Sequence, residues 1–508
     1  MLDTQSKLSL IGQTYKNIIS GWLSILLVAV VSIVLTPVVL NNAGKELYGL
    51  WFLVFNVMSY FYIADFGITS AITRLYAKYN INNKLDAYKL ISTSYLLVLL
   101  IDVIVVLVIL NFSEDIYKFL EIKSKYFQIF STLLLIAVFE LFTQFILRVN
   151  IGVLKGKHRY DIAYNLEGLS AALRLTAILL LLILDSFTIV TFALAYSLSK
   201  IFSDALSFYY IKEDIKGFQF SFDANIFREL FDIGSSSLLT SIASALYNSL
   251  PLLLFGKFFG VDKVFIYSIP FAIMIILTRL INAIYHGVTP RSSELKELGG
   301  EVEIEKISSF GVKISAVLGF SFLCFFIIFG ESLLHMWLGD KILDENDYIF
   351  IYNILIILLI YLFVSTLQKV NIFIYKSTGF HWLVTYETII SVFLLYLCSY
   401  ILFDYIGMYV FSVALVIVGI FKYIFYKSIA RNKITTYSLS FASLILSVFY
   451  LLFIYIVNDM FSEYLVIKLL FFIVTMVIYL ALIYKYIFNH HEKDKIKQQF
   501  FQIMRKIA

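Results

Sequence analysis

GKELYGLW at residues 44–51 and GVDKVFIY at residues 260–267 are two stretches of similar pattern that lie 216 residues apart. Each follows a long apolar segment with a proline near its far end, Pro37 or Pro251, and each precedes another long apolar segment. A repeat of this size in an apolar chain is typical of transporters built from two similar halves. We therefore expect two related helical bundles that face each other across a pathway.

The composition places the protein in a membrane. Hydrophobic residues make up 61% of the 508 residues, charged residues only 15%, and the mean hydropathy is +0.88. Soluble domains are about half apolar and about a quarter charged. Since about 20 apolar residues cross the hydrocarbon core as a helix, we expect an all-α polytopic membrane protein. A barrel would show short alternating segments instead.

About fourteen segments are long enough to cross a bilayer. The first six correspond to the next six across the repeat, and the last two have no counterpart, so we expect them to be appended outside. The predicted spans cover residues 15–40, 47–68, 89–112, 126–150, 164–184, 187–210, 231–256, 263–287, 307–330, 347–369, 381–403, 404–428, 436–458 and 461–488. The predicted domains are an N-terminal lobe at 1–210, a C-terminal lobe at 211–430, the appended spans at 431–488 and a basic tail at 489–508.

The basic residues of the connectors predict the orientation. With the N-terminus inside, roughly 28 Lys and Arg residues lie on the inner side and roughly 7 on the outer side, as the positive-inside rule requires. An even number of spans then places both termini in the cytoplasm. The basic residues are scattered over several connectors, which argues against a nucleic-acid partner.

Charged residues inside the predicted spans are the candidate binding groups. A charge at mid-bilayer costs about 2.5–3.5 kcal/mol, so it faces a partner or water. Arg174 near the middle of the fifth span either binds an anionic headgroup in bidentate fashion or pairs with Glu167 or Asp204. Lys200 lies one turn from Asp204, which favours a local ion pair over a role toward a ligand.

Two further polar faces follow helical spacing on the seventh and eighth spans. The eighth carries Arg279, Asn282 and His286, and Arg279 either faces water or snorkels toward the cytoplasmic side. The face of the seventh either lines a pathway or lets helices pack closely, and it consists of Ser237, Ser241, Ser244 and Asn248.

Two carboxylates are candidates for proton coupling. Glu140 forms a row with Gln144 and Arg148 on the fourth span, and this row either lines a cavity or clamps neighbouring helices. Asp65 lies at the inner end of the second span. His286 is the other side chain considered as a proton carrier.

Prolines are confined to a few spans. Pro37, Pro251 and Pro270 lie in or beside the first, seventh and eighth spans. Because proline removes a backbone hydrogen bond and bends a helix, these spans are the expected gating elements. The sequence contains no metal-ligand set, P-loop, nucleophile elbow or dinucleotide loop, so we expect no metal, no cofactor and no enzymatic activity.

A series of short motifs, taken in order, resembles the polysaccharide transporter family of the multidrug/oligosaccharidyl-lipid/polysaccharide superfamily, the Wzx-type flippases. The motifs lie at the expected ends of the spans. They are Tyr48-Gly49-Leu50-Trp51, Asp65-Phe66-Gly67 with Arg74, Leu154-Lys155-Gly156, Arg159-Tyr160, LLFGKFFG at 253–260, Tyr267-Ser268, Pro290, and GESLL at 330–334 leading into MWLG at 336–339.

The resemblance implies a MATE-like fold of two six-helix lobes around a central cavity. It implies transfer of an undecaprenyl-pyrophosphate-linked oligosaccharide, a precursor of O-antigen, capsule or exopolysaccharide, from the inner to the outer leaflet of the bacterial cytoplasmic membrane. It also implies that cations such as Arg174 and Arg279 meet the pyrophosphate or acidic sugars. Implied partners are membrane lipids, a polysaccharide polymerase and a chain-length regulator.

Two groups of alternatives remain open. A drug/cation antiporter or a lipid II flippase would keep the fold and change the cargo. A membrane-embedded polymerase or glycosyltransferase would need catalytic residues on a substantial outer loop. Only Glu114, Asp115 and the 331–346 stretch are available for that role, and both lie on short connectors.

Overall fold

The computed structural model describes residues 4–61, 67–82, 84–216, 221–282, 285, 288–297, 299–339, 343–428, 471–475, 477–479 and 481. These residues form α-helices joined by turns and short 3₁₀-helices, with no β-strand among them. Ten stretches of the described residues are long and apolar enough to cross a membrane. The protein is therefore an all-helical, multi-pass membrane protein, which confirms that part of the prediction.

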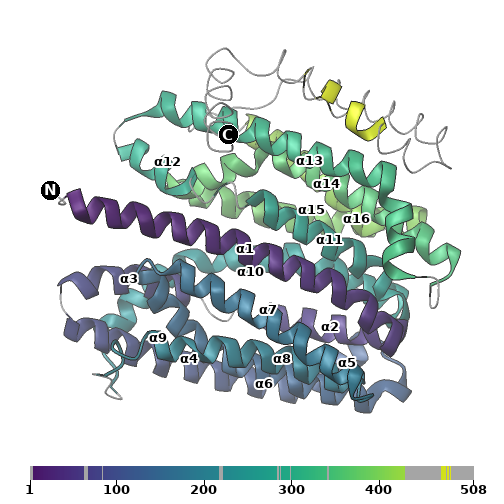
Figure 1. Cartoon of the computed structure of the whole chain (residues 1–508), viewed down its shortest axis with the longest axis horizontal. Coiled ribbons are helices and arrows are strands. Elements are labelled where there is room, and N and C mark those ends of the chain that lie inside the picture. The colour runs from purple at the N-terminus through teal and green to yellow at the C-terminus, as the bar shows by residue number, and fades with distance from the viewer. Residues whose placement is uncertain are drawn as a thin grey trace. The chain divides into compact units, whose positions relative to one another are not determined.

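Contacts between the helices divide the chain into two compact units, Met1–Ile269 and Pro270–Ala508. In the first unit, α6 packs against α2, α3, α4 and α8, while α1 lies along α7 (Figure 1). The helices of this unit are α1 (Thr4–Ala43), α2 (Lys45–Phe61), α3 (Ile68–Asn82), α4 (Lys84–Asn111), α5 (Ser113–Phe119), α6 (Phe127–Gly156), α7 (Tyr160–Ile183), α8 (Ile189–Ala205), α9 (Ser207–Tyr210) and α10 (Ala224–Phe259).

Helix α3 differs from the prediction, which leaves residues 69–88 as a connector between two spans. One face of α3 packs closely on α6, because α6 has glycines at the contact. A Cβ atom at Gly152 would lie 2.9 Å from Cγ2 of Ile72, and one at Gly156 would lie 3.0 Å from the carbonyl oxygen of Thr73. Small residues spaced by four let two helix backbones approach, and packing of this kind is not visible in hydropathy.

The two related stretches of the sequence contact each other. Residues 44–51 enter α2, and residues 260–267 form the 3₁₀-helix η3 (Val261–Lys263) and the start of α11 (Val264–Asn282). A Cβ atom at Gly49 would collide with the carbonyl oxygen of Val261, so only glycine allows this approach. Helix α10 also packs on α2, α3 and α4 within the first unit.

The second unit is organised around α14, which packs against α12, α13, α15 and α16. The contact between α13 and α14 is close, since a Cβ at Gly311 or Gly319 would lie 3.0 Å from the side chain of Val370 or Thr366. The helices of this unit, which also holds most of α11, are α12 (Val288–Glu297), α13 (Glu301–Leu338), α14 (Glu345–Ser377), α15 (His381–Ile406) and α16 (Val410–Ser428).

The turn between α15 and α16 lies at Gly407 and not at the predicted boundary between residues 403 and 404. Gly407 has φ 53° and is followed directly by the 3₁₀-helix η5 (Gly407–Tyr409). A left-handed backbone conformation strongly favours glycine, so the helix continues past Asp404 and ends at Ile406.

Within the described residues, helices overlap each of the first twelve predicted spans. Residues 436–458, most of 461–488 and the tail at 489–508 lie outside the described part, so the total of fourteen stays a prediction. The lobe boundary expected near residue 211 also stays a prediction; the compact units divide within α11.

Candidate substrate-binding site

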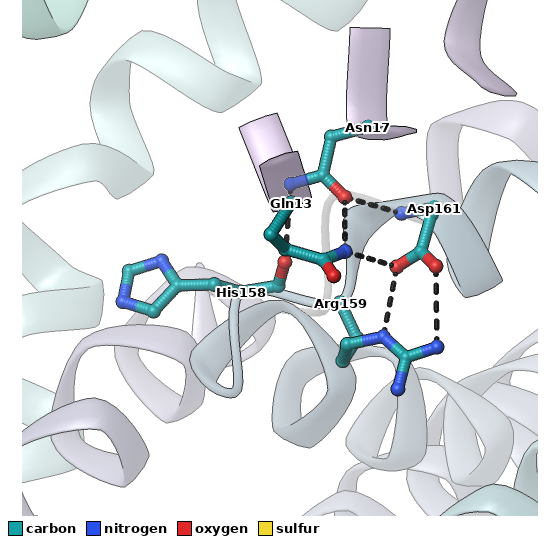
Figure 2. Close-up of polar contacts among 5 residues, drawn as sticks. All are labelled: Gln13, Asn17, His158, Arg159 and Asp161. Atoms are coloured by element: carbon teal, nitrogen blue, oxygen red, sulfur yellow. Dashed lines mark hydrogen bonds and ion pairs between the residues drawn. The ribbon is translucent and has the colours of Figure 1, made fainter. Parts of the chain in front are cut away.

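The basic connector on the predicted cytoplasmic side of α7 is held in a polar junction with α1 (Figure 2). Arg159 donates two hydrogen bonds to the Asp161 carboxylate, from Nε to Oδ1 at 3.0 Å and from Nη2 to Oδ2 at 3.2 Å. Gln13 donates to the same carboxylate at 2.8 Å, and Asn17 donates to the carbonyl oxygen of His158 at 3.0 Å. The charge of Arg159 is therefore neutralised locally.

Other connector lysines also have acidic partners. The Lys157 ammonium lies 2.7 Å from Asp214, which also accepts a hydrogen bond from Tyr76. Ion pairs between α3 or α4 and the start of α10 join Lys78 to Glu229 at 3.3 Å and Lys89 to Asp223 at 3.6 Å. These cations are paired with acidic residues and hold helices together. The candidate groups for an anionic ligand therefore lie inside the two units.

The first unit contains an inner group of charged side chains from α6, α7 and α8, called here the first-unit cluster: Glu140, Arg174, Tyr196, Lys200 and Asp204. The Lys200 ammonium lies 2.5 Å from the Asp204 carboxylate, which is the local ion pair that the spacing predicts. Glu140 accepts a hydrogen bond from Ser197 at 2.6 Å and thereby links α6 to α8. This contact favours the helix-clamping alternative for Glu140.

Arg174 pairs with neither Glu167 nor Asp204 among the described residues. Its guanidinium carbon lies 3.4 Å from the centroid of the Tyr196 ring, which is a cation–π contact. Trp51 and Phe55 of α2 each approach the same ring at 5.6 Å between centroids. The Arg174 Nε is buried without a hydrogen-bond partner in the described structure, so a donor remains for a ligand.

The charges of the first-unit cluster balance. Arg174, Lys200 and Asp204 all interact electrostatically with the Glu140 carboxylate. Two cations thus lie near two carboxylates, one of which is already paired at short distance. A balanced group of this kind has little excess field with which to attract an anion.

The second unit contains a group in which cations outnumber acids, called here the lysine cluster: Lys369, Lys376, Lys422 and Glu387. Lys422 lies 3.1 Å from Glu387, with exposed side-chain fractions of 12% and 1%. Ser391 and Tyr426 also donate hydrogen bonds to the Glu387 carboxylate, at 2.7 and 3.2 Å. Glu387 is therefore fully occupied by donors from α15 and α16.

Lys369 adds positive charge, and no acidic partner for it is found within the described helices. Its electrostatic neighbours are the ammonium groups of Lys422 and Lys376. Lys376 in turn interacts with Glu387 and Lys422. Three ammonium groups thus lie near one another, while Glu387, which interacts with Lys422 and Lys376, already has three donors. Like charges in such proximity are stable only with a counter-anion or water nearby.

Lys369, Glu387 and Lys422 lie at a similar depth because α15 runs antiparallel to α14 and α16, whereas Lys376 lies at the end of α14. Lys369 precedes the end of α14 at Ser377 by eight residues, which is about 12 Å along a helix. Glu387 follows the start of α15 by six residues, and Lys422 precedes the end of α16 by six, about 9 Å in each case. All three ends belong to the side predicted to face the cytoplasm.

Sequence reasoning missed the lysine cluster as a site. The predicted tenth span ends at Lys369, which makes this residue a boundary lysine, whereas α14 continues to Ser377. The helix extends beyond its apolar segment because polar residues also propagate a helix once it is packed. The recurrence of Lys369 and Lys376 at a spacing of seven was the available signal, since this spacing places both on one helix face.

Arg279, Asn282 and Asn248, the remaining predicted site residues that the structure describes, do not join either cluster. Arg279 and Asn282 lie at the C-terminal end of α11, and the Arg279 side chain is exposed. Asn248 is exposed on α10 and donates a hydrogen bond to the carbonyl oxygen of Ser244 at 2.7 Å. Asp65 and His286 lie outside the described residues.

The three prolines predicted to bend helices all lie inside them. Pro37 is in α1, Pro251 in α10 and Pro270 in α11. Their part in gating stays a prediction.

Comparisons with known proteins agree on the fold and the family. A structure of a multidrug resistance MATE family transporter of the MOP superfamily, in an inward-facing conformation, is 16% identical with a TM-score of 0.63, covering 80% of this chain and 94% of that one. The lipid II flippase MurJ, in an inward closed conformation, is 14% identical with a TM-score of 0.68, covering 94% and 99%. At these identities the likeness shows the fold alone.

A relative from Shigella flexneri, named "Putative O-antigen transporter", is 24% identical over 343 residues, which are 67% of this chain and 79% of the relative. The sequence profile of the family described as "Polysaccharide biosynthesis protein" matches residues 14–296. Together these similarities indicate a membrane transporter and not an enzyme. The chain belongs to the polysaccharide biosynthesis protein family, as a transporter with a MATE-like helical fold.

Proposed function

We propose that this protein is a flippase for undecaprenyl-pyrophosphate-linked oligosaccharide repeat units. It moves them from the inner to the outer leaflet of the bacterial cytoplasmic membrane by alternating access, with both termini in the cytoplasm. The family and the Shigella flexneri relative support transport of a polysaccharide precursor. A polymerase and a chain-length regulator are the partners expected to use the product.

The lysine cluster is the observation that carries the proposal. A pyrophosphate linker offers several anionic oxygens to a site that already contains more cations than acids. Lys369 and Lys376 lie close to Lys422, whose own acid is saturated by hydrogen bonds. Lysine binds phosphate as a compact point charge with three donors, so the cluster suits a diphosphate that enters from the inner leaflet.

The charge of the cargo also favours outward movement. The interior of a cell is electrically negative, and each elementary charge that crosses the membrane contributes about 2.3 kcal/mol per 100 mV. Export of an anionic headgroup is therefore downhill before any ion is coupled.

The two alternatives with the same fold make different demands on this site. A drug/cation antiporter would present carboxylates to its cargo, whereas Glu140, Asp204 and Glu387 already accept hydrogen bonds or pair with cations. A lipid II flippase would also carry a polyprenyl pyrophosphate, so the lysine cluster fits it equally well. The family and the Shigella flexneri relative favour the oligosaccharide.

The decisive experiment reconstitutes the purified protein in liposomes that contain a lipid-linked oligosaccharide. Transfer is measured as the fraction of sugar that becomes accessible to a membrane-impermeant lectin. We expect Lys369→Met to abolish most of the transfer and Lys427→Met to leave it unchanged, since Lys427 is exposed in the last turn of α16. Equal activity of the two variants would remove the lysine cluster from cargo binding.

Arg174 and Arg279 are proposed secondary contacts for acidic sugars. Replacing either by Ala should reduce transfer without preventing membrane insertion. Full complementation of a deletion strain by Arg279→Ala would exclude that residue, and accumulation of the lipid-linked repeat unit in the deletion strain itself would support the cargo.

A further inference from the structure

Asp102 is a carboxylate in the middle of the very apolar helix α4. The surrounding window of α4 has a mean hydropathy of 2.8, and Asp102 precedes the end of the helix at Asn111 by nine residues. Nine residues correspond to about 13 Å, close to half the thickness of the hydrocarbon core. No other acidic residue is found between Asp86 and the end of α4.

The side chain points into the first unit and not toward lipid. Asp102 is 0% exposed, whereas Leu100, Val103 and Ile104 on the other side of α4 are 60%, 45% and 53% exposed. Val98, Val105 and Ile109 continue the buried face of Asp102 at helical spacing. The inward face of α4 packs on α3, α6 and α10.

Asp102 is distinguished from every other buried acid in the described residues by its lack of a partner. Glu140 accepts from Ser197, and Asp161 from Arg159 and Gln13. Asp204 pairs with Lys200, and Glu387 with Lys422. Both carboxylate oxygens of Asp102 are buried with no hydrogen-bond donor.

The charged groups on the neighbouring helices do not interact electrostatically with Asp102. Glu140 on α6 is the charged residue nearest to Asp102 in depth across the membrane, and it is held by Ser197 of α8. The charged residues on the elements packed against α4, within the described part of the chain, are Arg74 and Lys78 on α3, Glu114, Asp115 and Lys118 on α5, Glu140, Arg148 and Lys155 on α6, and Arg228, Glu229, Asp232 and Lys257 on α10.

A buried carboxyl group without donors or cations loses the hydration that stabilises its anion, so such surroundings favour the neutral acid. This conformation therefore favours proton binding by Asp102. Any conformation that admits water to α4 restores the hydration of the anion and lets the carboxyl group exchange its proton with the water on that side. The protonation state of Asp102 thus depends on whether water can reach α4 inside the first unit.

We propose that Asp102 is the proton-binding residue that couples export of the cargo to inward movement of a proton. The carboxylate takes a proton from water on the outer side, carries it as an O–H group while α4 is dehydrated, and returns it to water on the cytoplasmic side. This inference rests on the proposed export function. It replaces Glu140, whose hydrogen bond to Ser197 and neighbouring cations give it a structural role.

Proton binding is tested first, without cargo. Purified full-length protein in lipid nanodiscs is titrated, and infrared difference spectra follow the C=O band of protonated carboxyl groups. We expect Asp102→Asn to remove a band that persists at neutral pH and Asp115→Asn to leave it unchanged, since Asp115 is exposed on α5. Identical bands in Asp102→Asn and the wild-type protein would overturn the proposal whatever the cargo is.

Coupling is tested in proteoliposomes that contain the lipid-linked oligosaccharide, with a proton gradient, a sodium gradient or neither. We expect a proton gradient to accelerate transfer by the wild-type protein. Asp102→Asn should lose this acceleration, and Asp102→Glu, which can still bind a proton, should retain it. Acceleration by sodium alone, or an unaltered response of Asp102→Asn, would overturn the coupling role.

The two tests separate the two proposals. If the wild-type protein transfers no oligosaccharide but Asp102→Asn removes the carboxyl band, the cargo is wrong and the proton site stands. If the wild-type protein transfers oligosaccharide at a rate independent of the proton gradient, the flippase function stands and the coupling role is refuted.

Discussion

Replacing Glu387 by Gln removes the one carboxylate of the lysine cluster while preserving the shape of the side chain. Lys422 then loses the Glu387 carboxylate, while Lys376 and Lys369 remain nearby. Ser391 donates to Oε1 of Glu387 and Tyr426 to Oε2, so the single amide oxygen of the variant can accept from only one of them. The change therefore removes the negative charge together with one hydrogen-bond acceptor.

The structure sets the size of the expected effect. At the observed 3.1 Å between Lys422 Nζ and Glu387 Oε1, an effective dielectric constant of about 20 gives about 5 kcal/mol of attraction before desolvation is counted. Removing one partner of a buried pair typically destabilises a protein by about 3–5 kcal/mol. Because Lys422 is 12% exposed and water can reach it, we expect about 3 kcal/mol, at the lower end of that range.

The assay is thermal or denaturant unfolding of the purified protein in nanodiscs. Glu387→Gln should unfold at a clearly lower temperature, and the double variant Glu387→Gln/Lys422→Met should recover most of the loss, because it removes both charges together. Lys427→Met on the same helix is the matched control. A Glu387→Gln protein as stable as the wild type, or a double variant that loses the sum of the two single changes, would refute the argument.

Three other expectations follow from the described contacts. Gly49→Ala should destabilise the protein by at least about 1–3 kcal/mol, because its methyl group collides with the Val261 carbonyl oxygen. Gly168→Ala is the control and should unfold like the wild type, since its Cβ would have no neighbour closer than 3.6 Å. The N–H of Ile226 donates to the side chain of Asp223 and lowers the pKa of Asp223 below its ordinary 3.8. The charge-dependent part of this cap stabilises above pH 3.8 and is lost as the pH falls through the lowered pKa, so Asp223→Ala should cost about 0.5–2 kcal/mol near pH 7 and less in strong acid, as measured by unfolding at both pH values. In a background with Cys324 and Cys398 replaced by Ala, a cysteine at Ser186 should react with an impermeant thiol reagent added outside intact cells, and one at Lys216 should not; the reverse pattern would invert the proposed orientation.

Much of the fold follows from hydropathy. Long apolar segments identify the helices because an unpaired backbone cannot exist in lipid. The ends of those helices are less predictable, since α13 and α14 extend beyond their apolar segments through residues that hydropathy assigns to connectors. For the same reason α3 is assigned to a connector, although its packing on Gly152 and Gly156 makes it part of the first unit.

The residues of the candidate site were only partly predictable from the sequence. The Lys200–Asp204 pair was predictable because the two residues are neighbours on one helix face. Arg174 was identified as a buried cation, but its contact with Tyr196 depends on the packing of α7 against α8. Asp102 gives the simplest signal, a single acid in an apolar span, yet it is not among the residues predicted from the sequence.

The sequence by itself determined that the protein is a multi-pass helical membrane protein with a family resemblance, because these properties depend on composition and on local order along the chain. Only the tertiary structure decided which charges are neutralised by residues of other helices. Glu387 and Lys422 are 35 residues apart in the sequence, yet they meet because α15 and α16 run antiparallel from the turn at Gly407. A charge becomes functional or structural according to the partners that packing brings to it, and those partners come from other helices.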